Sequence, residues 1–267
     1  MAVAGAPRKR ANYRGDGGSL RRALRLLDYV SNSHPHPVSL RSAASESGLT
    51  KATAFRLLSV LVEENMLVFQ PEAKVYMLGP RLGLIAARQL FRDPVRTAAR
   101  PAMQAVWQAT GETVTLSLRQ GFERIYIDQL ESPHPVRFQI ELGSRQPLHA
   151  GASGRAILAA MPEQELAEYL GSELPALTAA TVTDPGILRQ LVREAAERGF
   201  TVSHAERVAG VISVAAPVLD GSGHPVGALS ICAPDNRASV ASMEAEGPAL
   251  ARAAHDISVR LGYAAPV

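Results

Sequence analysis

The sequence predicts an α+β protein of two domains, a helical and basic one at the N-terminus and a larger mixed one after it. Apolar residues recur at helical spacing over most of the first third of the chain, and further on the period changes to two in several runs separated by more helices. The charge also divides unevenly between the two parts. With 46% hydrophobic and 20% charged residues, the 267-residue chain is not intrinsically disordered.

The formal net charge of +3 hides an asymmetry along the chain. Residues 1–60 contain ten Arg or Lys and three acidic residues, so that segment carries +7 and the remainder −4. A basic segment joined to a mildly acidic remainder is typical of a nucleic-acid-binding module joined to a second module. Residues 1–18 have no apolar periodicity and predict a disordered basic arm, which is also compatible with a merely solvated tail.

Several other classes of protein are excluded by composition and pattern. No apolar run reaches the roughly 18 residues that a membrane-spanning helix needs, and the first twenty residues lack the apolar segment of a secretory signal. The single cysteine, Cys232, cannot form an internal disulfide or supply a cysteine-based zinc site. We therefore expect a cytoplasmic protein with no membrane partner, no metal and no cofactor.

Three helices are predicted before the first extended run. Ser19 is the expected N-cap of the first helix, and the His34–Pro37 segment ends it. Ser39 caps a second helix over residues 40–47, and after a Gly48-Leu49 turn Thr50 caps a third over residues 51–64. The apolar stripe expected on the first helix is Leu20, Ala23, Leu24, Leu27 and Val30.

The second and third helices, around a turn that contains glycine, match a helix-turn-helix, whose second helix enters the DNA major groove. Extended runs at residues 66–69 and 75–78, joined by a polar turn, add a β-hairpin. Residues 19–79 are therefore interpreted as a winged helix-turn-helix domain. Any three-helix core shows similar stripes, so the interpretation depends on the basic charge, the short second helix, the turn and the wing occurring together.

The residues expected to contact DNA lie at helix starts, on the exposed face of the third helix and in the wing. Thr50 and Lys51 stand at a helix N-terminus, where free N–H groups favour phosphate, and Thr53 and Arg56 are spaced to reach base edges. Phe55 either contacts a thymine methyl group or packs on the wing. The full candidate set is Ser39, Arg41, Thr50, Lys51, Thr53, Phe55, Arg56 and Lys74.

The rest of the chain predicts a linker helix and an α+β domain with an antiparallel sheet. The linker helix occupies residues 80–92, the second domain residues 93–263 and a short tail residues 264–267. The second domain opens with a helix over residues 95–110 that Pro101 interrupts. The expected strands are 113–119, 124–130, 136–142, 211–219 and 225–232, and the expected helices 151–161, 163–170, 185–198 and 240–261.

Nine sequence motifs occur along the chain in the order of the predicted domains. The N-terminal part contains SLRRALRLLDYV, GLTKATAFRLLSVLVEENML and YMLGPRLGLI. The second domain contains TGETVTLSL, YIDQLESPHPVRF, GSRQPLHAGASGRAIL, TDPGILRQLVREAAERGF, GVISVAAPVLDGSGHPVGALSICAP and ISVRLGY. Over residues 19–263 the chain resembles IclR-type bacterial transcriptional regulators. The resemblance implies a winged helix-turn-helix, a linker helix and a GAF-like effector-binding domain with a curved antiparallel sheet. It also implies a homodimer or homotetramer on an inverted-repeat operator in double-stranded DNA, a small-molecule effector and no enzymatic activity.

The resemblance places the effector pocket between the loop at residues 146–154 and the last strands. That loop is rich in small residues and leads into a helix, whose N-terminus favours a carboxylate. We expect an organic or aromatic carboxylic acid, although Ser203, His204 and Ala205 stand where family members often carry acidic residues. The candidate effector-binding residues are Gln146, His149, Ala152, Ser153, Ser203, Ser213, Ser230 and Cys232.

No catalytic constellation emerges from the sequence. The GASGR segment lacks the fifth glycine of a nucleophile elbow, and GSGHPVG between two strands is a hairpin turn rather than a dinucleotide-binding loop. Two alternatives stay open beside a ligand-responsive regulator. One is a hydrolase or transferase with an accessory binding domain, and the other is an architectural DNA binder whose second domain only dimerises. A repressor and an activator share this architecture, so the sign of regulation stays open too.

Overall fold

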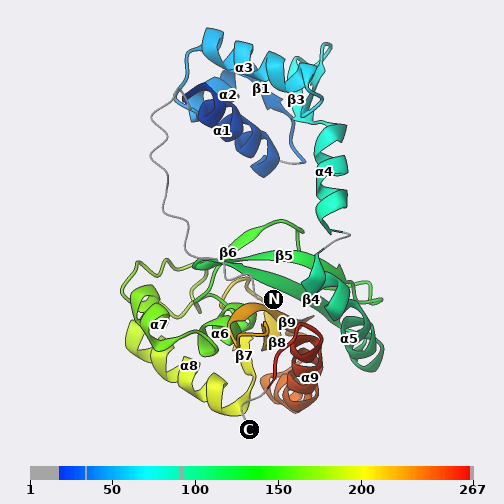
Figure 1. Cartoon of the computed structure of the whole chain (residues 1–267), viewed down its shortest axis with the longest axis vertical. Helices are drawn as coiled ribbons and strands as arrows, with labels where there is room; N and C mark the ends of the chain where they lie inside the picture. The colour runs from blue at the N-terminus through cyan, green and yellow to red at the C-terminus, as the bar shows by residue number, and fades with distance from the viewer. Residues whose placement is uncertain (1–17, 34, 91–92, 265–267) are drawn as a thin grey trace, which may run out of the picture. The chain divides into compact units, whose positions relative to one another are not determined.

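The computed structural model describes residues 18–33, 35–90 and 93–264, and the chain divides into two compact units between Gln89 and Leu90 (Figure 1). Each unit has a hydrophobic core of its own. The predicted basic arm lies outside the described residues except for Gly18. His34 and residues 265–267 also lie outside them.

The N-terminal unit is a winged helix-turn-helix followed by a further helix, as predicted. Its elements are α1 (Gly18–Asn32), β1 (Val38–Ser39), α2 (Leu40–Glu46), α3 (Lys51–Glu63), β2 (Leu67–Gln70), β3 (Val75–Leu78) and α4 (Pro80–Leu90). The strands form an antiparallel sheet in the order β1-β3-β2. The core between helices and sheet is built from Leu26, Val30, Val38, Ala43, Leu58, Leu61, Leu67 and Tyr76.

The predicted start of α1 was wrong, and its predicted apolar stripe was wrong in part. The helix begins at Gly18, so Ser19 lies inside its first turn instead of capping it, a shift of the size common at helix ends. Val30 is buried and Leu27 packs against the core, as predicted, whereas Leu20 and Leu24 are 65% and 49% exposed. Leu26, which was not in the predicted stripe, is fully buried, so the buried face is rotated about the helix axis relative to the prediction.

Strand β1 was not predicted, because two residues are too few to show alternation. Val38 pairs with Tyr76 and Ser39 with Val75, so β1 extends the predicted hairpin to three strands. Ser39 is also the N-cap of α2, as predicted, and its hydroxyl accepts a hydrogen bond from the Ser42 amide at 3.1 Å. Residue 39 therefore ties the wing sheet to the start of α2.

The C-terminal unit is an α+β domain around a curled, six-stranded antiparallel sheet, as predicted for its class. Its helices are α5 (Pro94–Thr110), α6 (Ala152–Ala159), α7 (Glu163–Leu170), α8 (Pro185–Arg198) and α9 (Val240–Arg260). Its strands are β4 (Thr113–Gln120), β5 (Glu123–Leu130), β6 (Arg145–Pro147), β7 (Thr201–His204), β8 (Val211–Leu219) and β9 (Pro225–Pro234). The strand order is β6-β5-β4-β9-β8-β7.

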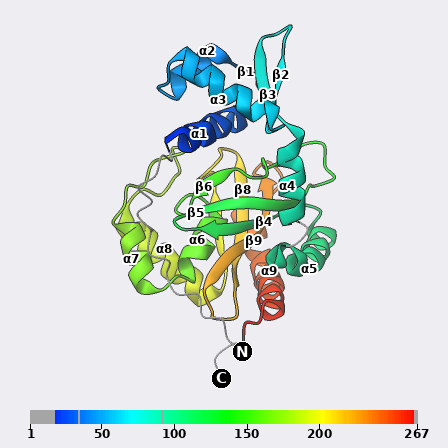
Figure 2. The same ribbon diagram turned by 45° about the horizontal axis from the view of Figure 1, so that its top comes forward.

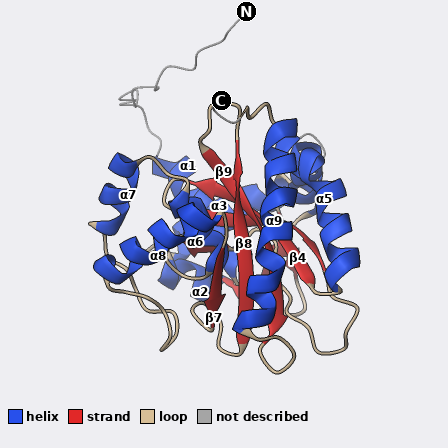
Figure 3. Cartoon of the chain, turned by 90° about the horizontal axis from the view of Figure 1, so that it is seen from below, coloured by secondary structure: helices blue, strands red, loops and turns tan. Residues whose placement is uncertain are grey.

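Helices cover both faces of this sheet. Figures 2 and 3 show α5 and α9 on one side and α6, α7 and α8 on the other. The α5/α9 side holds the larger apolar core, in which Leu116, Val214 and Ile231 of the strands pack against Met103 and Leu250 of the helices. A second apolar cluster joins α6, α7 and α8 to one end of the other face.

Two further predictions in this unit were wrong. Helix α5 runs through Pro101 without interruption, because Ala99 and Met103 on either side are fully buried and hold the backbone in place. The alternating residues 136–142 form no strand. Their backbone is held by side chains instead, since the Gln129 amide group bonds both the N–H and the C=O of Ile140, at 3.0 and 2.9 Å.

Candidate functional site

The start of α3 is built from two threonines that bond each other. The Thr50 hydroxyl, the N-cap, accepts from the Thr53 amide at 3.2 Å, and the two hydroxyl oxygens lie 2.9 Å apart. Lys51 and Arg56 are exposed on the same helix, and Phe55 is 54% exposed. The third helix therefore presents a cationic face with an aromatic ring, held by a cap of the kind that typically contributes about 0.5–2 kcal/mol.

The other candidate DNA contacts lie on α2 and in the wing. Arg41 is exposed in the first turn of α2. Lys74 is exposed in the β2–β3 turn, where its φ of 53° is a left-handed conformation. Together with α3, these positions give the N-terminal unit a set of exposed cations on a helix-turn-helix and its wing. That arrangement suits a major groove flanked by phosphates.

In the C-terminal unit, the sheet face toward α6 is polar. Ser203 pairs with Ser213 across β7 and β8, Ser213 with Cys232 across β8 and β9, and Cys232 with Thr113 across β9 and β4. The register thus puts one row of small polar side chains across four strands. The hydroxyls of Ser203 and Ser213 lie 2.9 Å apart. Buried hydroxyls need partners, and here they provide them for one another.

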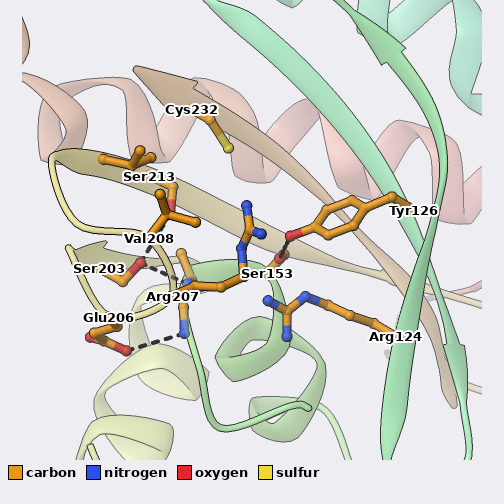
Figure 4. A pocket seen from close by; sticks show the side chains of 12 residues that line it. Arg124, Tyr126, Ser153, Ser203, Glu206, Arg207, Val208, Ser213 and Cys232 are labelled. Atoms are coloured by element: carbon orange, nitrogen blue, oxygen red, sulfur yellow. Dashed lines mark hydrogen bonds between the residues drawn. The ribbon is translucent and has the colours of Figure 1, made fainter. Parts of the chain in front are cut away.

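A narrow pocket, partly open to solvent, lies on this polar face, and the centre of a water-sized sphere has about 20 Å³ of free space in it (Figure 4). Five of the predicted effector residues line it, namely Ala152, Ser153, Ser203, Ser213 and Cys232. Gly151, from the predicted loop, also lines it. The sequence did not single out the remaining lining residues, Arg124, Tyr126, Glu206, Arg207, Val208 and Val211.

Three predicted effector residues do not line this pocket. His149 is fully buried, and its ring nitrogens lie 2.8 Å from the Tyr169 hydroxyl and 2.9 Å from the Pro175 carbonyl oxygen. Ser230 lies on the pocket side of β9, but its hydroxyl is 2.6 Å from that of Thr115. Gln146 lies on β6 opposite Arg124. None of these three residues is part of the pocket lining.

The first amide groups of α6 have partners within the protein. The Gly151 amide donates to the Glu206 carboxylate at 3.2 Å, and the Ala152 amide donates to the Ser203 hydroxyl at 2.8 Å. Figure 4 shows both bonds closing one side of the pocket. The expectation that the start of this helix offers its N–H groups to a ligand therefore fails for these two residues.

Cationic side chains dominate the charge around the pocket. Arg124 is fully buried and donates to the carbonyl oxygens of Pro147 and Ala150, the latter at 2.7 Å. Glu206 forms a buried ion pair with Arg155, which lies behind the lining. Arg207 adds a third guanidinium group. Three guanidinium groups against one carboxylate leave an excess of positive charge beside the pocket.

This positive charge also acts on Tyr126, whose hydroxyl lies 3.3 Å from that of Ser153. Burial raises the pKa of the Tyr126 phenol, but Arg124 and Arg207 lower it and prevail, so the pKa lies below its ordinary value of 10.0. Burial raises the pKa of the Cys232 thiol, which stays protonated at neutral pH. The pocket thus favours a negative charge on the Tyr126 side.

A pH titration followed by the ultraviolet absorbance of phenolate should show one tyrosine that ionises below the ordinary range. We expect Tyr126→Phe to remove that early step and to leave the later ones in place. Stability linked to this titration is present above the ordinary pKa and is lost as the pH falls through the lowered one. A Tyr126→Phe curve that overlays the wild-type curve would contradict the positive potential assigned to the pocket.

Gly154 lies where α6 packs tightly against Leu148 and Arg124. A Cβ at this position would collide with the Leu148 carbonyl oxygen and with the Arg124 guanidinium group. We expect Gly154→Ala to destabilise the protein by at least about 1 kcal/mol, as overpacking does, measured by thermal unfolding. Gly83→Ala is the matched control, since α4 leaves open space around Gly83 and alanine favours a helix. Equal melting temperatures for the two variants would be inconsistent with this packing.

The two units together define a class of protein, a transcriptional regulator with a DNA-binding helix-turn-helix and a separate ligand-binding domain. Comparison with known families agrees. Residues 19–71 match the IclR helix-turn-helix domain, and residues 87–259 match the C-terminal domain of the bacterial transcriptional regulator IclR. The chain belongs to the IclR family of bacterial transcriptional regulators, with DNA binding through the helix-turn-helix domain and effector binding in the C-terminal domain.

Individual relatives support this assignment. The chain is 32% identical to the transcriptional repressor AllR of Escherichia coli K12 over 248 residues, 92% of this chain and 91% of that protein. The Thermotoga maritima IclR crystal structure matches with a TM-score of 0.74 and 32% identity, covering 92% and 99% of the two chains. An IclR homologue from Microbacterium hydrocarbonoxydans, solved with 4-hydroxybenzoate, matches with a TM-score of 0.77 and 27% identity over 91% and 98%.

These relatives are transcriptional regulators and not enzymes, which removes the hydrolase and transferase alternative. In the described parts of the chain, no helix is both long and apolar enough to cross a membrane.

Proposed function

We propose that this protein is a cytoplasmic, sequence-specific transcriptional regulator. An organic or aromatic carboxylic acid bound in the C-terminal pocket changes its affinity for its operator. The observation that carries the proposal is the pocket itself. It is hydroxyl-lined, and the Arg124, Arg155 and Arg207 guanidinium groups around it outnumber the single Glu206 carboxylate. This excess of positive charge stabilises a bound anion and disfavours a bound cation. The structural relative solved with 4-hydroxybenzoate supports an aromatic carboxylate as the class of effector.

On the DNA side, we propose that α3 reads base edges through Thr53 and Arg56, with Phe55 on the same exposed face. Thr50 and Lys51 at its start, with Ser39 and Arg41 at the start of α2, hold the phosphate backbone. Lys74 in the wing reaches a further phosphate. The protein acts as a homodimer or homotetramer on an inverted repeat, and repression is the sign of regulation that its AllR relatives favour.

A mobility-shift titration on the DNA upstream of the protein's own gene tests this function. We expect a specific complex that survives competitor DNA, and a change in its affinity on adding an acid from a panel of organic and aromatic carboxylates. If the protein bound that DNA no more tightly than random DNA, the proposal of a sequence-specific regulator would be contradicted. A specific complex that no small molecule altered would instead favour an architectural DNA binder.

A further inference from the structure

Arg207 stands out among the charged residues of the C-terminal unit. It lies in the loop between β7 and β8 and lines the pocket. Its guanidinium carbon is 5.5 Å from the centre of the Tyr126 ring and 5.1 Å from that of Phe138. Within the described residues, no hydrogen bond or ion pair engages this guanidinium group. The guanidinium group therefore lies over two aromatic rings, and none of its five N–H donors has a partner among the described residues.

The neighbouring cations differ from Arg207 in this respect. Arg124 donates to two backbone carbonyls, and Arg155 donates to the Glu206 carboxylate and, at 3.1 Å, to the Val202 carbonyl oxygen. Both are almost completely buried. They are fixed parts of the walls. Glu206 is turned to Arg155 and the Gly151 amide, so the nearest carboxylate already has its partners.

The loop that carries Arg207 is anchored at both ends and open in the middle. The Ala205 amide donates to the Val211 carbonyl oxygen at 2.8 Å, and the Asp235 amide to that of Gly210 at 2.9 Å. The Thr181 hydroxyl donates to the Glu206 carbonyl oxygen at 2.6 Å. Residues 208–210 between these anchors are exposed. The backbone on either side is thus fixed, and the long Arg207 side chain reaches across the pocket from a defined base.

We propose that Arg207 is the residue by which this protein selects an anionic effector, forming a paired N–H···O contact with the ligand's carboxylate beside Tyr126 and Ser153. The proposal rests on the proposed function of the pocket. Figure 4 shows the Arg207 and Arg124 guanidinium groups both beside the Tyr126–Ser153 pair. A planar guanidinium group matches a carboxylate with two parallel hydrogen bonds, which an ammonium group cannot reproduce. Ligand binding therefore exchanges two ring contacts for a charge-assisted pair.

The test uses the full-length protein and three variants, Arg207→Gln, Arg207→Lys and Arg189→Gln. Arg189 is the control because it pairs with Glu163 on the surface of α8, away from the pocket. The ligands are 4-hydroxybenzoate, benzoate, pyruvate and succinate, each beside its neutral amide. Affinity is measured by calorimetry, and operator binding without ligand is measured on the same four proteins.

At least one carboxylate should bind the wild type and Arg189→Gln with the same affinity and more tightly than its amide does. Arg207→Gln should bind that carboxylate at least about ten-fold more weakly, with Arg207→Lys in between and operator binding unchanged in all four proteins. The proposal is overturned if Arg207→Gln keeps the wild-type affinity, if an amide binds as tightly as its acid, or if no carboxylate of the panel binds. If the wild-type protein did not bind the operator, that result would instead count against the proposed function as a DNA-binding regulator.

Discussion

Replacing Glu206 by alanine should destabilise the C-terminal unit by about 3–5 kcal/mol, the usual cost of removing one partner from a buried ion pair. The side chains of Arg155 and Glu206 are 2% and 9% exposed, so the charge left on Arg155 would be buried without its counterion. The same carboxylate accepts from the Gly151 amide. The substitution therefore also frees the start of α6, which forms one wall of the pocket.

Thermal or denaturant unfolding measures this effect, and Glu163→Ala is the matched control. Glu163 also pairs with an arginine, Arg189, but its side chain is 73% exposed, and such surface pairs contribute about 0–1 kcal/mol. Glu206→Ala should lower the midpoint far more than Glu163→Ala does. Similar midpoints for the two variants would show that the buried pair does not hold the pocket wall together.

Replacing Arg56 by alanine should weaken operator binding by about 1–3 kcal/mol, which is roughly five- to 150-fold, if its side chain reads a base. Arg56 lies on the exposed face of α3, two positions beyond the core residue Ala54. Its replacement should therefore leave the packing of the core and the stability of the fold unchanged. The effect should be confined to the specific operator, because base contacts contribute little to binding of random DNA.

Titrations at several salt concentrations separate this role from a simple phosphate contact. Lys51→Ala should weaken binding to all sequences and lower the salt slope by about one, whereas Arg56→Ala should leave the slope nearly unchanged. Arg189→Ala, on the surface of α8, serves as the charge-matched control. An Arg56→Ala protein with wild-type operator affinity and salt slope would remove Arg56 from the interface.

Much of the fold was predictable because long periodic segments have one way to bury their apolar residues. The caps at Ser39 and Thr50 and the long strands β8 and β9 follow directly from local pattern. The short strands β1, β6 and β7 were missed, since two to four residues carry no period, whereas the equally short β2 and β3 were predicted because a polar turn joins them as a hairpin. The alternation at residues 136–142 misled because the Gln129 side chain, and not a neighbouring strand, satisfies the backbone there.

The pocket was predictable on its neutral side and not on its charged side. The resemblance to the family pointed to Ser203, Ser213 and Cys232, and the register of β7, β8 and β9 brings these three residues together in one row. Arg124 lies on a strand where an arginine ordinarily indicates solvent, and its burial depends on two carbonyl groups from a loop more than twenty residues away. Arg207 lies in a loop whose fold over the Tyr126 and Phe138 rings is a long-range event that no local pattern encodes.

The central claim is that the pocket and the DNA-binding surface are coupled, and a linkage measurement built on two pairs of affinities tests it most directly. The affinity of the active carboxylate is measured for the free protein and for the operator complex, and operator affinity is measured with and without the acid. Linkage requires both ratios to be equal, and allosteric coupling typically makes them about five- to 150-fold. We expect equal ratios in that range. An acid that binds the free and the operator-bound protein equally well would contradict a ligand-responsive regulator.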